Sequence, residues 1–368
     1  MEKVDIQVET GTLREAVGKV YRVVSGHPAI PVLSGILLEA GNGTLTLTAT
    51  DYEMGVRSSC PVEMTEEGSA VLPGKIFSNL VRSAPKGLIR LLSHPDHTVE
   101  VFSGKSYYKL SGFPPEDFPL FPPFSETSSL TIPGEELREA LLQTYFAVSK
   151  DEMRPPLTGV FFSLTEGALH LVSTDGHRLS VRGITRFTST IPEFRGIVPA
   201  RSASELLRLV SQKEVVLFPG KGEILFQVGE TELFSRLIEG EYPRYEQVIP
   251  REFVTEIELP RVEFLSALER ASLIASVNSV VEVHLREEGV ELLCQAPEVG
   301  IAREELEGKV EGQRFAVAFN VRYLLEALRV VDWEKVKIGL SGELSPAKVF
   351  QEGGAFQYVI MPVKLREE

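Results

Sequence analysis

Residues 173–181, Ser-Thr-Asp-Gly-His-Arg-Leu-Ser-Val, place a carboxylate, an imidazole and a guanidinium within four positions. A histidine close to an aspartate is the general base of many hydrolytic sites, so His177 with Asp175 is a candidate catalytic pair. Such a site also needs an activated nucleophile, and no Gly-x-Ser-x-Gly turn occurs in the chain. The alternative is a polar turn between two strands, because apolar alternating segments flank the stretch on both sides.

The other groups that could bind a metal or a nucleotide are few. His94-Pro95-Asp96-His97 contains metal-binding side chains, but Pro and Asp between two apolar runs are typical of a connecting turn. Neither a phosphate-binding P-loop nor a Gly-x-Gly-x-x-Gly motif follows a predicted strand. Cys60 and Cys294 are each set in or beside apolar stretches, with no CxxC spacing. The sequence therefore predicts no catalytic residues, no metal and no cofactor.

Length and composition limit the class of protein. The chain has 368 residues, of which 43% are hydrophobic and 24% charged, and this length predicts two or three domains. No apolar run could span a bilayer, and the N-terminus MEKVDIQVET lacks the apolar core of a signal peptide. We expect a cytoplasmic protein with no membrane partner. The net charge of −14, taken as a whole, argues against a nucleic-acid partner.

A threefold internal repeat organises these segments. Two kinds of amphipathic helix recur about every 120 to 127 residues, with alternating strands between them and a Gly at each predicted hairpin turn. The pattern predicts an α+β fold of three repeated domains, each with two helices and about eight strands. Pro-rich segments separate the repeats, and the predicted domains are residues 1–122, 123–248 and 249–368.

The repeat bears on the candidate catalytic pair. Thr50-Asp51 of the first repeat aligns with Thr174-Asp175 of the second, so this pair is better explained by a turn than by catalysis. The continuation, Gly176-His177-Arg178, is peculiar to the second repeat.

Charge is unevenly distributed between the predicted helices and the rest of the chain. The six helices together carry +7, whereas the remainder carries −21. If the helices share one surface, that surface could hold a phosphate backbone without reading bases. Ordinary solvated helix faces are the alternative. The residues in question are Arg14, Lys19, Arg22, Lys75, Arg82, Arg201, Arg208, Arg261, Arg270 and Arg322.

Four stretches occur in the order and spacing of a known family: LSGILLEAGNGTLTLTATDYEM, STDGHRLSV, EGEYPRYEQVIP and the tail YVIMPVKL. With the threefold repeat, they make the chain closely resemble the bacterial sliding clamps, the β subunits of DNA polymerase III, from residue 1 to about 365. The resemblance implies a DNA-clamp fold and a homodimer that closes as a six-domain ring around duplex DNA. It implies a non-catalytic processivity factor that binds DNA without sequence specificity.

The resemblance also implies a peptide-binding cleft between the second and third domains. The expected partners are the DNA polymerase III catalytic subunit, the clamp loader, and other polymerases and repair proteins that carry clamp-binding peptides. His177 and Arg178 would supply donors to the peptide, beside an adaptable apolar wall. The matching positions are Leu157, Thr174, Gly176, His177, Arg178, Leu179, Pro243, Val248, Val359, Met361, Pro362, Val363 and Leu365.

For the dimer contact, the resemblance implies that an edge strand of the first domain meets the third domain of the partner. Tyr108 and Leu110 match one side, and Leu273 and Ile274 match the other. Three places depart from the family pattern. His27 stands where members often have a basic residue facing DNA, and the loop Arg154-Pro155-Pro156 replaces a pair of aromatic residues seen in some members. In the tail, Val363 and Lys364 stand where other members have a longer apolar residue and Arg, and three extra residues follow Leu365.

Two other readings remain open at this point. One is a repeat protein that acts as a docking scaffold without DNA, and the other is an enzyme that uses His177.

Overall fold

The computed structural model describes residues 3–26, 28–119, 121, 124, 128–275, 279–297 and 299–364. The chain forms two compact units. Unit 1 comprises residues 1–135, 187–191 and 205–237, and unit 2 comprises residues 136–186, 192–204 and 238–368.

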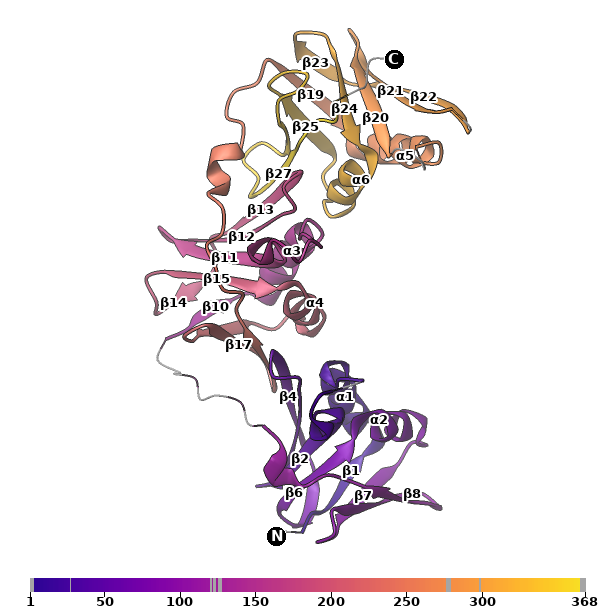
Figure 1. The fold of residues 1–368 in the computed structure, drawn as a ribbon, viewed down its shortest axis with the longest axis vertical. Coiled ribbons are helices and arrows are strands. Elements are labelled where there is room, and N and C mark those ends of the chain that lie inside the picture. Colours follow the sequence, from indigo (N-terminus) through magenta and orange to yellow (C-terminus); the bar gives the residue numbers. More distant parts are fainter. Residues whose placement is uncertain are drawn as a thin grey trace. The chain divides into compact units, whose positions relative to one another are not determined.

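Each repeat contains two α-helices and nine strands in the described residues, which confirms the predicted α+β repeat (Figure 1). The strands beyond the predicted eight are accounted for by short edge strands of two to four residues. The first repeat consists of β1 (Asp5–Glu9), α1 (Thr10–Val20), β2 (Gly35–Gly41), β3 (Thr44–Thr50), β4 (Met54–Pro61), β5 (Glu63–Glu66), β6 (Gly68–Pro73), α2 (Gly74–Ser83), β7 (Leu88–Ser93), β8 (Thr98–Ser103) and β9 (Ser106–Ser111).

The second and third repeats follow the same order. The second consists of β10 (Leu130–Ile132), α3 (Gly134–Tyr145), β11 (Gly159–Thr165), β12 (Ala168–Thr174), β13 (Arg178–Ile184), β14 (Thr188–Ser189), β15 (Phe194–Pro199), α4 (Ala200–Leu209), β16 (Val215–Pro219), β17 (Glu223–Val228) and β18 (Thr231–Arg236). The third consists of β19 (Thr255–Pro260), α5 (Arg261–Ser272), β20 (Val280–Leu285), β21 (Gly289–Ala296), β22 (Gly300–Glu307), β23 (Lys309–Gly312), β24 (Ala316–Asn320), α6 (Val321–Arg329), β25 (Lys335–Leu340), β26 (Ala347–Phe350) and β27 (Phe356–Ile360).

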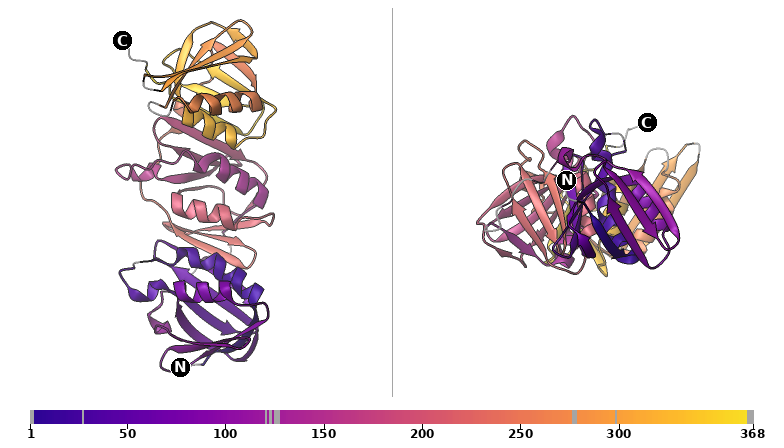
Figure 2. Two further views of the ribbon diagram at one scale, coloured as in Figure 1. Left: turned by 90° about the vertical axis from the view of Figure 1, so that its right-hand side faces the viewer. Right: turned by 90° about the horizontal axis from the view of Figure 1, so that it is seen from below.

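The first helix of each repeat buries the same apolar stripe. Residues at helical spacing i, i+3, i+4 and i+7 are almost fully buried in all three, as expected for amphipathic helices that cover sheets. In unit 1, α1 packs beside α2 and against β3 and β4, and in unit 2, α5 packs beside α6 and against β21 and β22 (Figure 2). The stripe residues are Leu13, Ala16, Val17 and Val20 in α1, Leu137, Ala140, Leu141 and Thr144 in α3, and Phe264, Ala267, Leu268 and Ala271 in α5.

Two nine-stranded sheets run from one repeat into the next. In unit 1 the order is β14-β10-β16-β17-β18-β4-β3-β2-β6, so the second repeat joins the first through the β18–β4 pair. In unit 2 the order is β15-β11-β12-β13-β27-β26-β25-β19-β23, so the second repeat joins the third through the β13–β27 pair. We call these pairs the unit 1 junction and the unit 2 junction.

The remaining strands form two smaller sheets. The five-stranded sheet, β5-β1-β7-β8-β9, ends on β9, and the four-stranded sheet, β22-β21-β20-β24, ends on β22. Both strands are therefore edges within the described chain. No helix in the described segments has the length and apolar character needed to cross a membrane.

Candidate functional site

The Thr174–Arg178 stretch is a turn held by its own side chains. Asp175 Oδ1 accepts hydrogen bonds from the backbone N–H groups of His177 (2.9 Å) and Arg178 (3.1 Å). Thr174 Oγ1 donates to the carbonyl of Arg178 (2.5 Å) and accepts from the N–H of Gly176 (3.1 Å). This is the local bonding that Asp and Thr supply in turns, so the predicted turn role of the Thr-Asp pair is confirmed.

The aligned turn in the first repeat has the same bonds. Asp51 Oδ1 accepts from the N–H groups of Glu53 (3.1 Å) and Met54 (2.8 Å), and Thr50 Oγ1 donates to the carbonyl of Met54 (3.0 Å). The residue after Asp has a positive φ in both turns, 75° at Tyr52 and 90° at Gly176. Glycine adopts this conformation without strain, and it also leaves the turn bare of a side chain.

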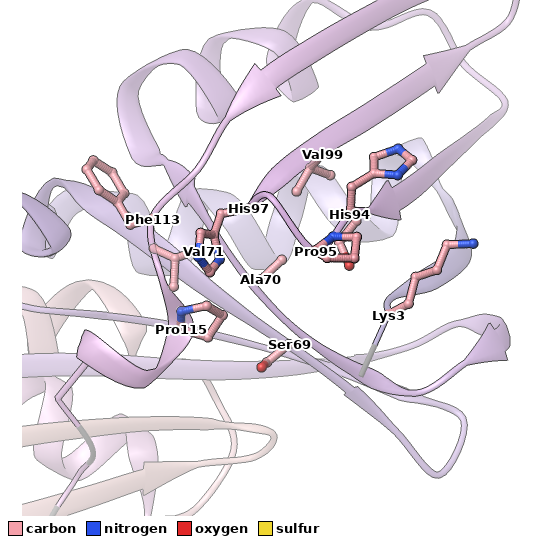
Figure 3. A pocket seen from close by; sticks show the side chains of 11 residues that line it. Lys3, Ser69, Ala70, Val71, His94, Pro95, His97, Val99, Phe113 and Pro115 are labelled. Atoms are coloured by element: carbon pink, nitrogen blue, oxygen red, sulfur yellow. The ribbon is translucent and has the colours of Figure 1, made fainter. Parts of the chain in front are cut away.

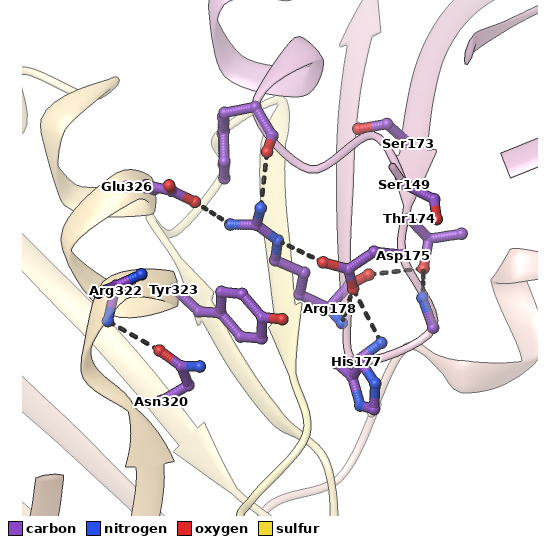
Figure 4. Close-up of polar contacts among 12 residues, drawn as sticks. Ser149, Ser173, Thr174, Asp175, His177, Arg178, Asn320, Arg322, Tyr323 and Glu326 are labelled. Carbon is purple, nitrogen blue, oxygen red and sulfur yellow. Dashed lines mark hydrogen bonds and ion pairs between the residues drawn. The ribbon is translucent and has the colours of Figure 1, made fainter. Parts of the chain in front are cut away.

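Arg178 departs from the role expected of it. Its side chain is 8% exposed, and its guanidinium is bonded to Asp175 Oδ2 (3.0 Å), Glu326 and the carbonyl of Phe146 (Figure 4). The guanidinium also lies over the rings of Tyr323 (4.3 Å) and Phe146 (5.4 Å). Its donors are thus directed to neighbours inside unit 2 rather than toward an incoming peptide. Arg178 joins β13 to α6 across the unit 2 junction.

An apolar cluster lies on the strands that follow this turn. Leu179 pairs with Val359 in register across β13 and β27, and Val172 and Val181 extend the cluster along β12 and β13. The linker after β18 covers it: Tyr245 is buried there, and the ring of Tyr242 stacks on Phe161 with 4.6 Å between centroids. Burial raises the pKa of Tyr245 to about 12 and also raises the pKa of Tyr242, so both phenols remain neutral near pH 7.

The other predicted peptide-site residues also belong to unit 2. The N–H of Met361 donates to the carbonyl of His177 (2.9 Å), which extends the β13–β27 pairing into the C-terminal tail, and the N–H of Val363 donates to the carbonyl of Ala318 (2.8 Å). His177 and Gly176 are exposed, and Met361 and Val248 have exposed fractions of 40% and 52%. Leu157 is buried, Thr174 and Pro362 are half-buried and Pro243 is exposed. Leu365, together with residues 366–368, lies outside the described residues.

The predicted DNA-facing cations differ in how they are used. Arg14 donates to the carbonyl of Ala84 (2.9 Å), so it caps the end of α2 rather than projecting freely. Lys19 pairs with Glu15 (2.8 Å), Arg208 with Glu205 (3.9 Å) and Arg270 with Glu304 (2.5 Å). Arg261 is half-buried. The remaining members are exposed: Arg22, Lys75, Arg82, Arg201 and Arg322. His27 lies outside the described residues.

The predicted dimer residues occupy the two sheet edges or their surroundings. Tyr108 and Leu110 lie on β9, with Tyr108 44% exposed and Leu110 half-buried. Leu273 follows α5 and is 73% exposed, while Ile274 packs against the core of the third repeat. An exposed leucine and tyrosine at these places are consistent with a contact surface.

The His94–His97 stretch forms the connecting turn that its composition predicts. Asp96 Oδ1 accepts from the N–H of Thr98 (3.1 Å), and His97 has a φ of 62°. The imidazoles of His94 and His97 lie apart from one another around a small hollow (Figure 3). Over the residues that the structure describes, no group of three His, Cys, Asp or Glu side chains is arranged to hold a metal ion.

Sequence reasoning missed Tyr323 and Glu326, because α6 is distant in the chain from Arg178 and no motif links them. It also missed Tyr242 and Tyr245 as the cover of the apolar cluster. A signal for these two was present: Tyr-Pro-Arg-Tyr at 242–245 repeats the aromatic-Pro-x-aromatic order of Phe-Pro-Leu-Phe at 118–121. Phe121, in turn, packs over Gly55 and Phe234 in unit 1.

Comparison with known proteins decides the family. Models of the N-terminal, central and C-terminal domains of the DNA polymerase III beta subunit match residues 4–122, 131–244 and 246–364. The chain belongs to the family of the DNA polymerase III beta subunit, the beta sliding clamp. The beta sliding clamp of Staphylococcus aureus strain Mu50 is 30% identical over 357 residues, which cover 93% of this chain and 94% of that protein. That of Staphylococcus epidermidis is 31% identical over 338 residues, covering 88% and 89%.

Solved structures of this family have the same fold. The DNA polymerase sliding clamp from Bacillus subtilis has a TM-score of 0.94 at 28% identity, covering 99% of this chain and 100% of that one. The beta subunit from DNA polymerase of Streptococcus pyogenes also has a TM-score of 0.94 at 28% identity, covering 98% and 100%. The predicted DNA-clamp fold of three repeated domains is thereby confirmed.

Proposed function

We propose that two copies of this chain close head to tail into a ring around duplex DNA and hold a DNA polymerase on it without catalysis. The observation that carries the proposal is that β9 and β22 are edge strands of the two smaller sheets in the described part of the chain. Each internal junction joins four strands of one repeat to five strands of the next. The five-stranded sheet ending on β9 and the four-stranded sheet ending on β22 are the halves of a third such sheet.

The internal junctions predict the register of this third sheet. When the three repeats are aligned on their hairpins, one position of the repeat is held by Lys109, Phe234 and Val359. Another position is held by Ile301, Gly55 and Leu179. Phe234 pairs with Gly55 and Val359 pairs with Leu179. Lys109 of one copy should therefore pair with Ile301 of the other.

Side chains near these edges support the same arrangement. Tyr108 and Leu273 correspond to Tyr358 and Phe146, whose rings lie 5.7 Å apart at the unit 2 junction. We infer that Tyr108 contacts Leu273 of the partner copy in the same way. The register also sets Lys105 opposite Glu305, which places unlike charges across the pair.

A ring of this kind needs a lumen that attracts phosphate without binding individual bases. The exposed cations on the helices, Arg22, Lys75, Arg82, Arg201 and Arg322, would supply it. We assign the surface around His177, Leu179, Val359 and Met361 to peptides of the polymerase III catalytic subunit, the clamp loader, and other polymerases and repair proteins. Gly176 has no side chain that would obstruct a partner backbone there. Arg178 holds the turn in place through its hydrogen bond to the carbonyl of Phe146.

Disulfide trapping tests the ring. Lys109→Cys with Ile301→Cys in one chain should give a covalent dimer on oxidation, whereas Lys109→Cys with Arg303→Cys, on the same face but two residues out of register, should react much less. Cys60 and Cys294 give little background, because burial raises the pKa of each thiol to about 11.

The same disulfide tests the DNA partner. Rings sealed in the presence of nicked circular plasmid should stay on the plasmid in 1 M salt and be lost after the plasmid is cut once. Sealed dimers that never stay on circular DNA would favour the docking scaffold without DNA. A monomer that fails to cross-link in either register would overturn the ring.

A further inference from the structure

The surface beside Leu179 and Val359, which are themselves each only 3% exposed, carries the half-buried Lys348. Thr174, Leu179, Val359 and Lys348 pair successively across β12, β13, β27 and β26, so their side chains lie in one row on the same face of the sheet. Among the described residues, no carboxylate forms an ion pair with Lys348, and its ammonium lies 4.9 Å from the centre of the Phe350 ring. Partial burial lowers the pKa of Lys348.

A groove of about 710 Å³ adjoins this row. It lies between the sheet and the linker that follows β18, and its floor is open because Ala168, Gly183 and Ala355 present little or no side chain. Lys348, Arg251 and His170 line it together with a single carboxylate, Glu246. Lys348 and Arg251 therefore outnumber Glu246 in the lining, while burial lowers the pKa of His170 and favours its neutral imidazole.

The corresponding row of side chains in unit 1 can be compared with this row in unit 2. There Thr50, Gly55, Phe234 and Leu225 pair in the same way, so an apolar leucine stands where unit 2 has Lys348. Phe121 and Phe124 cover Phe234. The cation of that surface, Arg57, has its own partner, Glu232, at 3.2 Å. In unit 1 the arginine is thus paired with a carboxylate, whereas in unit 2 Lys348 has no carboxylate partner among the described residues.

We propose that Lys348, with Arg251 and His170, forms a seat for a carboxylate side chain of a peptide docked on the exposed surface beside the buried Leu179–Val359 pair. This rests on the proposed peptide-docking function and adds a preference to it: among peptides with equal apolar residues, those with Asp or Glu beside them bind best. A carboxylate would give Lys348 the charge-assisted partner that no described residue of the chain supplies.

Paired synthetic peptides test the seat in the full-length chain. One fluorescein-labelled decapeptide carries an adjacent Leu and Phe flanked by Glu on both sides, and its twin carries Gln in place of each Glu. Fluorescence anisotropy should show that the Glu peptide binds about five- to tenfold more tightly than the Gln peptide, the order expected of one partly desolvated ionic hydrogen bond.

Two variants locate the effect. Lys348→Gln should remove the preference, so that the Glu and Gln peptides bind this variant with equal affinity. Lys337→Gln is the matched control, because Lys337 lies on the adjacent strand β25 and is already paired with Glu352 at 2.6 Å. That variant should keep the preference, and equal melting temperatures would show that both variants are folded.

The outcomes distinguish failure of the carboxylate seat from failure of the docking surface. Equal binding of the Glu and Gln peptides to the natural chain would overturn the seat and leave the docking surface standing. A preference that survives Lys348→Gln would also overturn it. If neither peptide binds at millimolar concentration, the docking surface itself is wrong and the seat is rejected with it.

Discussion

The unit 1 and unit 2 junctions share one strand register, one Thr-Asp turn and one aromatic-Pro-x-aromatic linker, yet their surfaces differ. At the unit 1 junction, Phe121 lies over Gly55 and the Arg57–Glu232 pair neutralises itself. At the unit 2 junction, Leu179 and Val359 stand in place of Gly55 and Phe234. The contrast shows that the repeat builds the same joint twice, whereas the side chains on the two joints differ in size and charge.

The buried arginine is the largest difference between the junctions. Arg178→Met, which copies Met54 of the unit 1 turn, leaves Asp175 and Glu326 without their cation. Because breaking a buried ionic network typically costs 3 to 5 kcal/mol, we expect the free energy of unfolding to fall by about 3 kcal/mol.

Urea unfolding followed by circular dichroism measures this loss. Arg57→Met is the matched change in unit 1, and it should cost less than about 1 kcal/mol, since its ion pair is about a third exposed. Equal losses in the two variants would contradict the assignment of Arg178 as a structural joint.

The linker that contains Tyr245 and the linker that contains Phe121 should differ in how alkaline pH changes the stability of their junctions. Burial raises the pKa of Tyr245 from its ordinary value of 10.0 to about 12, whereas Phe121 has no ionisable group. The unfolded chain therefore loses this proton before the folded chain does. The stabilisation contributed by the protonated Tyr245 is complete below pH 10 and falls by about 1.4 kcal/mol for each pH unit between 10 and 12.

Thermal unfolding across this pH range, compared between the natural chain and Tyr245→Phe, isolates the effect. The variant should lose less stability than the natural chain above pH 10. Parallel curves for the two proteins would show that the linker tyrosine is accessible to solvent.

The smallest expected difference concerns the positive-φ residue of the two turns. Gly176→Ala should cost about 1 kcal/mol, because a side chain there is strained, and Tyr52→Gly should stabilise the chain by up to about 1 kcal/mol for the opposite reason. Differential scanning calorimetry gives both values. A loss of stability in Tyr52→Gly would mean that the contacts of the Tyr52 ring outweigh the backbone strain.

Local signals were sufficient for much of the fold. Helical spacing located the stripes of α1, α3 and α5, and Asn42-Gly43 and Glu166-Gly167 turn with positive φ as their hairpins require. The Thr-Asp turn was predictable because its bonds join residues two to four positions apart. The docking residues came from family resemblance, not from any physical pattern in the chain.

By itself, the sequence determined the threefold repeat, the amphipathic helices and the turns, because each depends on residues near one another in the chain. Only the tertiary structure decided that Arg178 is enclosed by Glu326, Tyr323 and Phe146. It also decided that Lys348 lies beside Val359 with no carboxylate paired to it among the described residues. These facts depend on which strands and helices pack together and on how much water they exclude. The charge of a side chain can be read from its letter, but whether that charge is already partnered depends on residues that only folding brings near.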